Sequence, residues 1–257
     1  MFRVIYAIAA ILVILLTPSA SPATTTRNDY FLNIGNVQQI TCMSLPAGVT
    51  LGDDPEKWTD DQIDQIQFQT GTGTIIAHNR VLTAAHVVHG AATCFFGKAL
   101  VQISFEDRAL DVAVLDVPLG ETAFSPISCD GFDSLADEPF FAIGYAWGKD
   151  FAIQKQQFTG QYIAAALTDT TETMQDEHLG LFAGETYPGM SGGPIVGQDG
   201  RIYGVVIGGD QREVSLYRDL RDTPLCAAMQ PAPASAADEK KTDSVESLID
   251  LLRKPLK

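Results

Sequence analysis

A serine, a histidine and an aspartate in this chain have the types and settings that nucleophilic catalysis requires. Ser191 lies in the segment Gly-Met-Ser-Gly-Gly-Pro at positions 189–194, His86 follows two alanines, and Asp111 opens an apolar run. A serine hydroxyl is a weak nucleophile until a base takes its proton, and a histidine oriented by a carboxylate is such a base. The order His, Asp, Ser along the chain therefore predicts an acyl-transfer site.

The glycine-rich segment also supplies donors for a developing negative charge. Gly189 can adopt the positive φ that a tight turn requires, and the amides of Gly189 and Ser191 can then point into one concavity. Two such donors form an oxyanion hole. Taken alone, the serine segment is compatible with a tight turn and His86 with a core position. The joint occurrence of all three candidates favours catalysis.

The remaining histidines and two further aspartates are weaker candidates. The histidines are expected in polar turns or at the surface, and the aspartates lack the Asp-x-Ala-x-Leu context of Asp111. These residues are His78, His89, His178, Asp107 and Asp116.

Short apolar runs, bounded by Gly, Pro, Asp and Asn, must position the candidate residues. They are four to six residues long and rich in β-branched and aromatic side chains, which is typical of strands. Many short strands with little helical periodicity predict a sandwich or a barrel. The clearest runs are 73–77, 80–83, 100–105, 112–115, 140–144 and 203–207.

Helical signals are confined to three segments. Residues 58–66 offer Thr59 as a cap and acids in the first turn, and residues 84–90 allow a single turn. Residues 244–254 are amphipathic and follow a low-complexity linker over 229–243. We expect this last helix to pack on the body, with docking to a partner or a membrane surface as the alternative.

The N-terminus has the composition of a signal peptide. Arg3 precedes the apolar run 4–16, and small residues follow over 17–23. The run is too short to span a bilayer comfortably. Cleavage after Ala20 or Ala23 would give an exported protein, periplasmic or secreted, with no stable membrane span; an uncleaved anchor is the alternative.

Export places the four cysteines in an oxidising compartment, where two disulfides are expected and three pairings are possible. The absence of a Cys-x-x-Cys pair in the sequence argues against a zinc site. A net charge of −15 argues against binding to nucleic acid or anionic lipid. The same charge suits both a solubilised surface and the attraction of basic substrates.

Three stretches together resemble the trypsin-like, chymotrypsin-fold serine proteases, and their bacterial members most. Residues 71–88 match the strands that lead to the histidine, 110–115 the strand of the aspartate, and 189–209 the serine loop and the following strand. The resemblance implies an all-β fold of two six-stranded antiparallel β-barrels with a short C-terminal helix. The implied segments are a signal peptide 1–23, leader 24–34, N-terminal β-barrel 35–120, inter-barrel linker 121–136, C-terminal β-barrel 137–228, flexible linker 229–243 and amphipathic helix 244–254.

The resemblance also implies the catalytic roles, with no metal and no organic cofactor. Ser191 attacks the carbonyl carbon, His86 moves the proton and Asp111 orients the imidazole. Proteins or peptides would be the substrates, and the oligomeric state stays open. The main alternative is a non-catalytic binding or regulatory protein on the same fold. An esterase of the α/β-hydrolase fold is disfavoured by the order of the three residues and by the lack of long helices.

The resemblance places substrate-binding residues at Glu185 and at Val206, Ile207, Gly208 and Gly209. Basic side chains are favoured if Glu185 lies at the base of the pocket. Small or apolar side chains are favoured if it points to solvent. The two glycines would leave a strand edge on which an extended substrate could pair.

The residue before the serine is Met190, where the animal digestive members carry an aspartate that pairs with a new N-terminus after activation cleavage. That route is closed to this chain. We therefore expect removal of the signal peptide alone to give the active form.

Overall fold

The computed structural model describes residues 34–54, 57–120, 122–135, 137–163, 179–210, 213–221 and 223–229. The predicted signal peptide over 1–23 and the predicted helix over 244–254 lie outside these ranges, as does nearly all of the linker between 229 and 243.

The N-terminal sheet consists of seven antiparallel strands, two of which lead directly to the histidine and the aspartate of interest. Its order is β5-β4-β1-β2-β3-β7-β6. The strands are β1 (Val37–Ser44), β2 (Gln67–Ala77), β3 (Arg80–Thr83), β4 (Thr93–Phe96), β5 (Ala99–Leu100), β6 (Gln102–Asp107) and β7 (Val112–Asp116).

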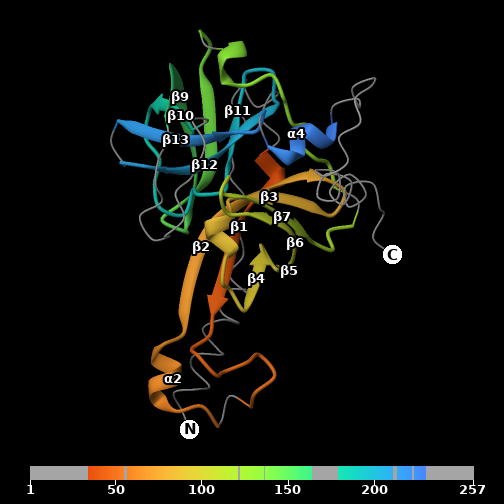
Figure 1. Ribbon diagram of the computed structural model, residues 1–257, viewed down its shortest axis with the longest axis vertical. Coiled ribbons are helices and arrows are strands. Elements are labelled where there is room, and N and C mark those ends of the chain that lie inside the picture. Colours follow the sequence, from red (N-terminus) through yellow and green to blue (C-terminus); the bar gives the residue numbers. More distant parts are fainter. Residues whose placement is uncertain are drawn as a thin grey trace, which may run out of the picture.

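The C-terminal half is a closed barrel of six strands in the order β10-β13-β12-β11-β8-β9. Figure 1 shows it above the N-terminal sheet, with α2 at the end of an arm that leaves that sheet between β1 and β2. The strands are β8 (Phe140–Ala146), β9 (Asp150–Ile163), β10 (Leu179–Ala183), β11 (Pro194–Val196), β12 (Ile202–Gly209) and β13 (Val214–Asp219). The short helices are η1 (Ile34–Asn36), α2 (Asp60–Asp64), α3 (Ala85–Val88), η3 (Phe132–Leu135) and α4 (Pro224–Met229).

The predicted all-β, chymotrypsin-like architecture is confirmed, with one difference in the N-terminal half. That half is a seven-stranded half-barrel rather than a closed six-stranded one. Its edge strand β5 has only two residues, and the other edge strand β6 carries a bulge between Ile103 and Phe105. A short strand and a bulge both limit edge pairing, so the sheet does not close on itself.

The predicted local elements are present. Each of the expected strand runs lies in a strand, with the run 100–105 divided at Val101 between β5 and β6. The helix expected over 58–66 is α2, and Thr59 caps it in a capping box with Gln62. The turn expected over 84–90 is α3.

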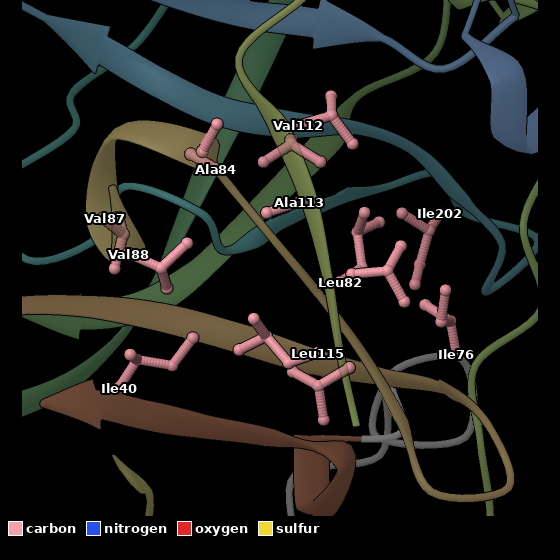
Figure 2. Packing of buried hydrophobic residues seen from close by; sticks show 14 of the residues in the cluster. Ile40, Ile76, Leu82, Ala84, Val87, Val88, Val112, Ala113, Leu115 and Ile202 are labelled. Carbon is pink, nitrogen blue, oxygen red and sulfur yellow. The ribbon is translucent and has the colours of Figure 1, made fainter. Parts of the chain in front are cut away.

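The core consists of two hydrophobic clusters, one of which spans both halves. One fills the N-terminal sheet and continues into the barrel, where Ile202 of β12 lies with Leu82 and Leu115 (Figure 2). The other is an aromatic cluster inside the barrel, in which Phe182 contacts Phe132 edge to face with ring centroids 4.9 Å apart. The continuous first cluster fixes the N-terminal sheet against the barrel.

All four cysteines form disulfides, as the sequence predicted, and the structure selects one of the three pairings. Cys42 and Cys94 are directly opposite each other on β1 and β4. Cys129 joins Cys226 of α4 and closes a separation of 97 residues. Among the described residues, no helix has the length and apolar character needed to cross a membrane.

Candidate active site

Asp111 holds His86 at two points. The carboxylate accepts the backbone N–H of His86 at 2.7 Å through Oδ1, and Oδ2 lies 2.6 Å from the ring Nδ1. Asp111 is 1% exposed and has φ +54°, a left-handed conformation that aspartate tolerates better than most residues. Because the carboxylate binds both the backbone and the ring, the imidazole has one orientation and its Nε2 faces away from Asp111.

The short helix α3 presents His86 to the surface. Val87 and Val88 are buried and anchor the helix, while the His86 side chain remains 32% exposed. Gln69 of β2 donates to the backbone carbonyl of His86 at 2.7 Å. The histidine is therefore fixed at its backbone and open at one ring nitrogen.

The loop of Ser191 is clamped between β2 and β12. Thr72 of β2 donates its N–H to the carbonyl of Ser191 at 2.8 Å, and its hydroxyl donates to the carbonyl of Gly189 at 2.8 Å. On the other side, the N–H of Gly192 donates to Val206 of β12 at 2.8 Å. One strand from each half of the molecule thus fixes the nucleophile loop.

The serine loop lies against the residues before His86, and β2 lies between that loop and the residue after His86. A Cβ on Gly192 would clash with Thr83 Oγ1 and with the backbone nitrogen of Ala84, which precede the histidine. A Cβ on Gly71 would clash with Val87, which follows it, and would lie 3.1 Å from the carbonyl oxygen of Ser191. Only glycine permits this close approach.

The hydroxyl of Ser191 does not bond to the imidazole in this structure. Its Oγ donates to the carbonyl oxygen of Ile207 at 3.4 Å, which is long for a hydrogen bond between oxygens. The structure therefore joins His86 to Asp111 directly and places Ser191 beside them on an adjoining loop.

Two amides of the serine loop remain free. Met190 donates its N–H to Tyr187 at 3.0 Å, and Gly193 donates to Met190 at 2.9 Å. Within the described part of the chain, the amides of Gly189 and Ser191 donate to no acceptor. These are the two amides that the sequence predicted for an oxyanion hole. Gly189 has φ +89°, the positive value expected of it.

The structure places Glu185 at the surface. Its side chain is exposed and accepts a hydrogen bond from the hydroxyl of Tyr187. This hydrogen bond raises the pKa of the Tyr187 phenol, with burial adding to the rise. Of the two orientations considered for Glu185, the structure has the one toward solvent.

The predicted pocket strand has buried and open parts. Val206 and Ile207 are buried, whereas a Cβ on Gly208 would meet no atom within 4 Å. Thr186 contacts this strand next to Gly208. Its hydroxyl is 3.1 Å from the hydroxyl of Ser215 and 3.4 Å from the carbonyl of Gly208. Sequence reasoning missed Thr186 and Ser215, because single hydroxyl residues carry no distinctive spacing.

The weaker candidates have partners outside the site. His89 lies 2.6 Å from Glu106, Asp107 accepts the N–H of Leu110, and Asp116 pairs with Arg80. His78 lies next to Asn79, and His178 falls outside the described residues. No group of three metal-ligating side chains occurs within the described ranges.

Comparison with known proteins agrees with this architecture. The sequence model of the trypsin-like peptidase domain matches residues 71–205, which include the histidine, the aspartate and the serine. No curated protein sequence matches the chain.

Several solved protease structures are similar to this one. The active form of the Rv3671c protease from M. tuberculosis aligns with TM-score 0.57 and 21% identity, over 86% of this chain and 94% of that one. The HtrA-type protease AlgW with a decapeptide aligns with TM-score 0.55 and 17% identity, over 79% and 65%. A serine endoprotease from Yersinia pestis aligns with TM-score 0.54 and 14% identity, over 80% and 65%. At these identities the similarity concerns the fold.

Proposed function

This chain belongs to the trypsin-like peptidase family, and we propose that it is an exported serine endopeptidase acting on protein or peptide substrates. The observation that carries the proposal is the two-point attachment of Asp111 to His86 beside the clamped loop of Ser191. A carboxylate in this position fixes the neutral tautomer and stabilises the imidazolium that forms during proton transfer.

The proposed reaction proceeds in two stages, formation of an acyl-enzyme on Ser191 and its hydrolysis by water. Ser191 Oγ forms a bond to the carbonyl carbon while its proton moves to His86 Nε2, and the free amides of Gly189 and Ser191 receive the negative oxygen. The bond from carbon to nitrogen then breaks, and Nε2 returns the proton to the leaving amine. Water, deprotonated by His86, then attacks the acyl carbon, the bond to Ser191 Oγ breaks, and the serine regains its proton.

The first step requires a rotation of the Ser191 side chain. Its present acceptor, the carbonyl of Ile207, is 3.4 Å away, so little hydrogen-bond energy is lost when the hydroxyl turns toward the imidazole. Staggered rotamers about χ1 give the side chain discrete alternatives. The hydroxyl is therefore expected to reach the ring without movement of the clamped loop.

Export is part of the proposal. All four cysteines form disulfides, which persist in oxidising compartments. Residues 1–23 have the pattern of a signal peptide. Fractionation of a full-length protein carrying a C-terminal tag, with N-terminal sequencing of the released form, would test both points. A protein that keeps residue 1 would contradict cleavage.

A non-catalytic binding protein is the second candidate, because Ser191 bonds to Ile207 rather than to His86 in this structure. A fluorophosphonate probe separates the two, since it reacts only with an activated serine. We expect one adduct per chain on Ser191 in the protein that begins at Thr24.

The controls are Ser191→Ala and His86→Ala, which should not react, and Ser44→Ala, which should react as the wild type does because Ser44 lies outside the site. Natively folded wild-type protein with both disulfides and no adduct would favour the binding protein. Hydrolysis of a peptide library by the wild type and not by Ser191→Ala would identify the side chains that the enzyme accepts.

A further inference from the structure

The turn that joins β8 to β9 presents a tryptophan in an unusual backbone conformation. Trp147 has φ +57°, and the following Gly148 has φ +62°. A bulky residue rarely adopts this left-handed conformation, which costs about 1–2 kcal/mol. The indole is nevertheless 55% exposed. An exposed apolar ring on a strained turn adds little to folding, and such strain is often found at ligand sites.

The turn is anchored on the nucleophile loop. Trp147 donates its N–H to the carbonyl of Pro188 at 2.5 Å, and Gln39 of β1 donates to the carbonyl of Gly148 at 2.5 Å. Gly148 also lies so close to Gly189 that a Cβ on Gly189 would clash with its backbone nitrogen. The backbone of the turn that carries the indole is thus fixed against the glycine that offers a free amide.

Tyr187 lies beside the indole and is itself oriented. The two ring centroids are 6.0 Å apart, with the planes inclined by 39°, a normal separation for an aromatic pair. The hydroxyl of Tyr187 donates to the carboxylate of Glu185. We call Trp147 and Tyr187 the aromatic shelf.

The aromatic shelf is on the β2 side of the nucleophile loop. The loop contacts β12 on one side and β2 on the other, as described above, and Gly148 packs against Thr70 of β2. An acyl segment paired with Gly208 and Gly209 would approach from the β12 side. The leaving segment would then continue across Ser191 toward β2 and the shelf.

We propose that the aromatic shelf binds a large apolar side chain on the residue that follows the scissile bond. This inference rests on the proposed peptidase function and specifies its substrate class. Rigid, exposed aromatic rings are effective binding groups because few rotatable bonds must be ordered when they make contact. One buried aliphatic or aromatic side chain contributes about tenfold or more to binding.

The leaving side can be probed separately from the acyl side by transfer of an acyl group to added amines. A p-nitrophenyl ester of a short acyl peptide forms the acyl-enzyme, and the release of p-nitrophenol measures that step. An amino-acid amide then forms a bond from its nitrogen to the acyl carbon as the bond to Ser191 Oγ breaks, and its proton passes through His86 to the serine. The amide occupies the site of the leaving residue, because the step reverses departure of the amine.

We expect leucinamide and phenylalaninamide to compete with water about tenfold better than glycinamide in the wild type. Trp147→Asn should abolish this preference, since asparagine accepts a positive φ and keeps the turn. The preference is measured as the ratio of amide product to hydrolysis product from the same acyl-enzyme, so a change in the rate of p-nitrophenol release does not alter it. Trp147→Phe should restore part of the preference. Trp58→Ala is the matched control, because Trp58 is the other tryptophan of the chain and precedes α2 on the arm.

Each outcome bears on the proposal. Equal use of the three amides by the wild type, or a preference that survives in Trp147→Asn, would overturn the assignment of the aromatic shelf while the peptidase function stands. Absence of p-nitrophenol release from wild-type protein would overturn the peptidase function and, with it, this inference.

Discussion

Arg218 of β13 donates a hydrogen bond from Nε to the carbonyl oxygen of Leu110, 2.7 Å away, across the junction between the barrel and the N-terminal sheet. Arg218 is 1% exposed, and Leu110 directly precedes Asp111 in the chain. A residue of the C-terminal barrel therefore fixes the peptide group between Leu110 and Asp111. Because Asp111 carries His86, this bond links the barrel to the orientation of the imidazole.

Replacing Arg218 by methionine should reduce both stability and turnover. A hydrogen bond from a charged donor contributes about 1.5–3 kcal/mol, so the free energy of unfolding should fall by about that amount. The shifted Leu110 peptide should lower kcat about tenfold with little change in KM, because Arg218 acts through the Leu110–Asp111 segment and His86 (a tenfold change is about 1.4 kcal/mol). Urea unfolding and steady-state kinetics at a temperature where the variant is folded would measure the two effects.

Arg201→Met is the matched control. Arg201 is 53% exposed and lies 3.8 Å from Asp199, a surface pair of the kind that contributes about 0–1 kcal/mol. Neither stability nor kcat should change appreciably. A folded Arg218→Met protein with wild-type kcat would show that the contact with Leu110 is structural only.

Asp111→Asn should preserve the backbone and lose the catalytic function of the carboxylate. Asparagine tolerates φ +54° and can still accept the N–H of His86 through its oxygen. Its amide would instead donate to Nδ1, which selects the tautomer with the proton on Nε2. We expect kcat to fall about 10⁴-fold, the size of this change in the serine-protease triad.

Asp107→Asn provides the comparison. Asp107 accepts the N–H of Leu110 at 2.9 Å, and asparagine retains the accepting oxygen. Activity should remain close to that of the wild type. If the two variants lose activity equally, the loss reflects disturbance of this region rather than the tautomer of His86.

Local features of the sequence predicted the elements well, because the interactions that form them span few residues. The capping box of α2 joins Thr59 to Gln62, three positions apart. The strands follow from the apolar runs between turn residues. The candidate residues were predicted from residue types and their order, which depend on chemistry rather than on packing.

Interactions between distant segments were not predictable in the same way. The pairing of Cys42 with Cys94 depends on the register of β1 and β4. The contact of Arg218 with Leu110 joins residues 108 positions apart. The orientation of Glu185 also stayed open, although its partner Tyr187 is only two positions away, because no motif in the sequence specifies the direction of a single side chain.

Asp219 should make stability fall as the pH rises above about 4. Burial raises the pKa of this carboxyl above its usual value, against hydrogen bonds from Arg221, Tyr162 and Phe132. The folded state therefore holds the proton more tightly than the unfolded chain. The stabilisation of the folded state by protonated Asp219 is complete below the pKa of an aspartate in the unfolded chain, about 3.9. It is lost as the pH rises through the higher pKa of the folded state. The free energy of unfolding, measured in urea between pH 4 and pH 7, should decline less in Asp219→Asn than in the wild type.

Asp133 should make stability fall as the pH decreases, the opposite of Asp219, although both carboxylates contact Arg221. Burial alone would raise its pKa, but a backbone hydrogen bond and Arg221 outweigh burial and lower it. Its contribution is present above the unfolded pKa and is lost as the pH falls through the lower folded value. The effect should be small, because the side chain is 59% exposed. An Asp133→Asn protein that reproduced the Asp219→Asn profile would contradict the assignment to burial.

Gly189→Ala should disable the proposed oxyanion hole. An alanine there must adopt φ +89°, and its Cβ would lie 2.5 Å from the carbonyl oxygen of Tyr145 and would clash with the nitrogen of Gly148. These are backbone atoms, so the loop must shift and reorient its amides. Loss of one donor lowers kcat about 10²–10³-fold.

Gly160→Ala isolates the cost of positive φ, because Gly160 has φ +77° and a Cβ there would meet nothing within 4 Å. It should lose about 1–2 kcal/mol of stability with kcat unchanged, and equal kcat values in the two variants would remove Gly189 from the proposed hole.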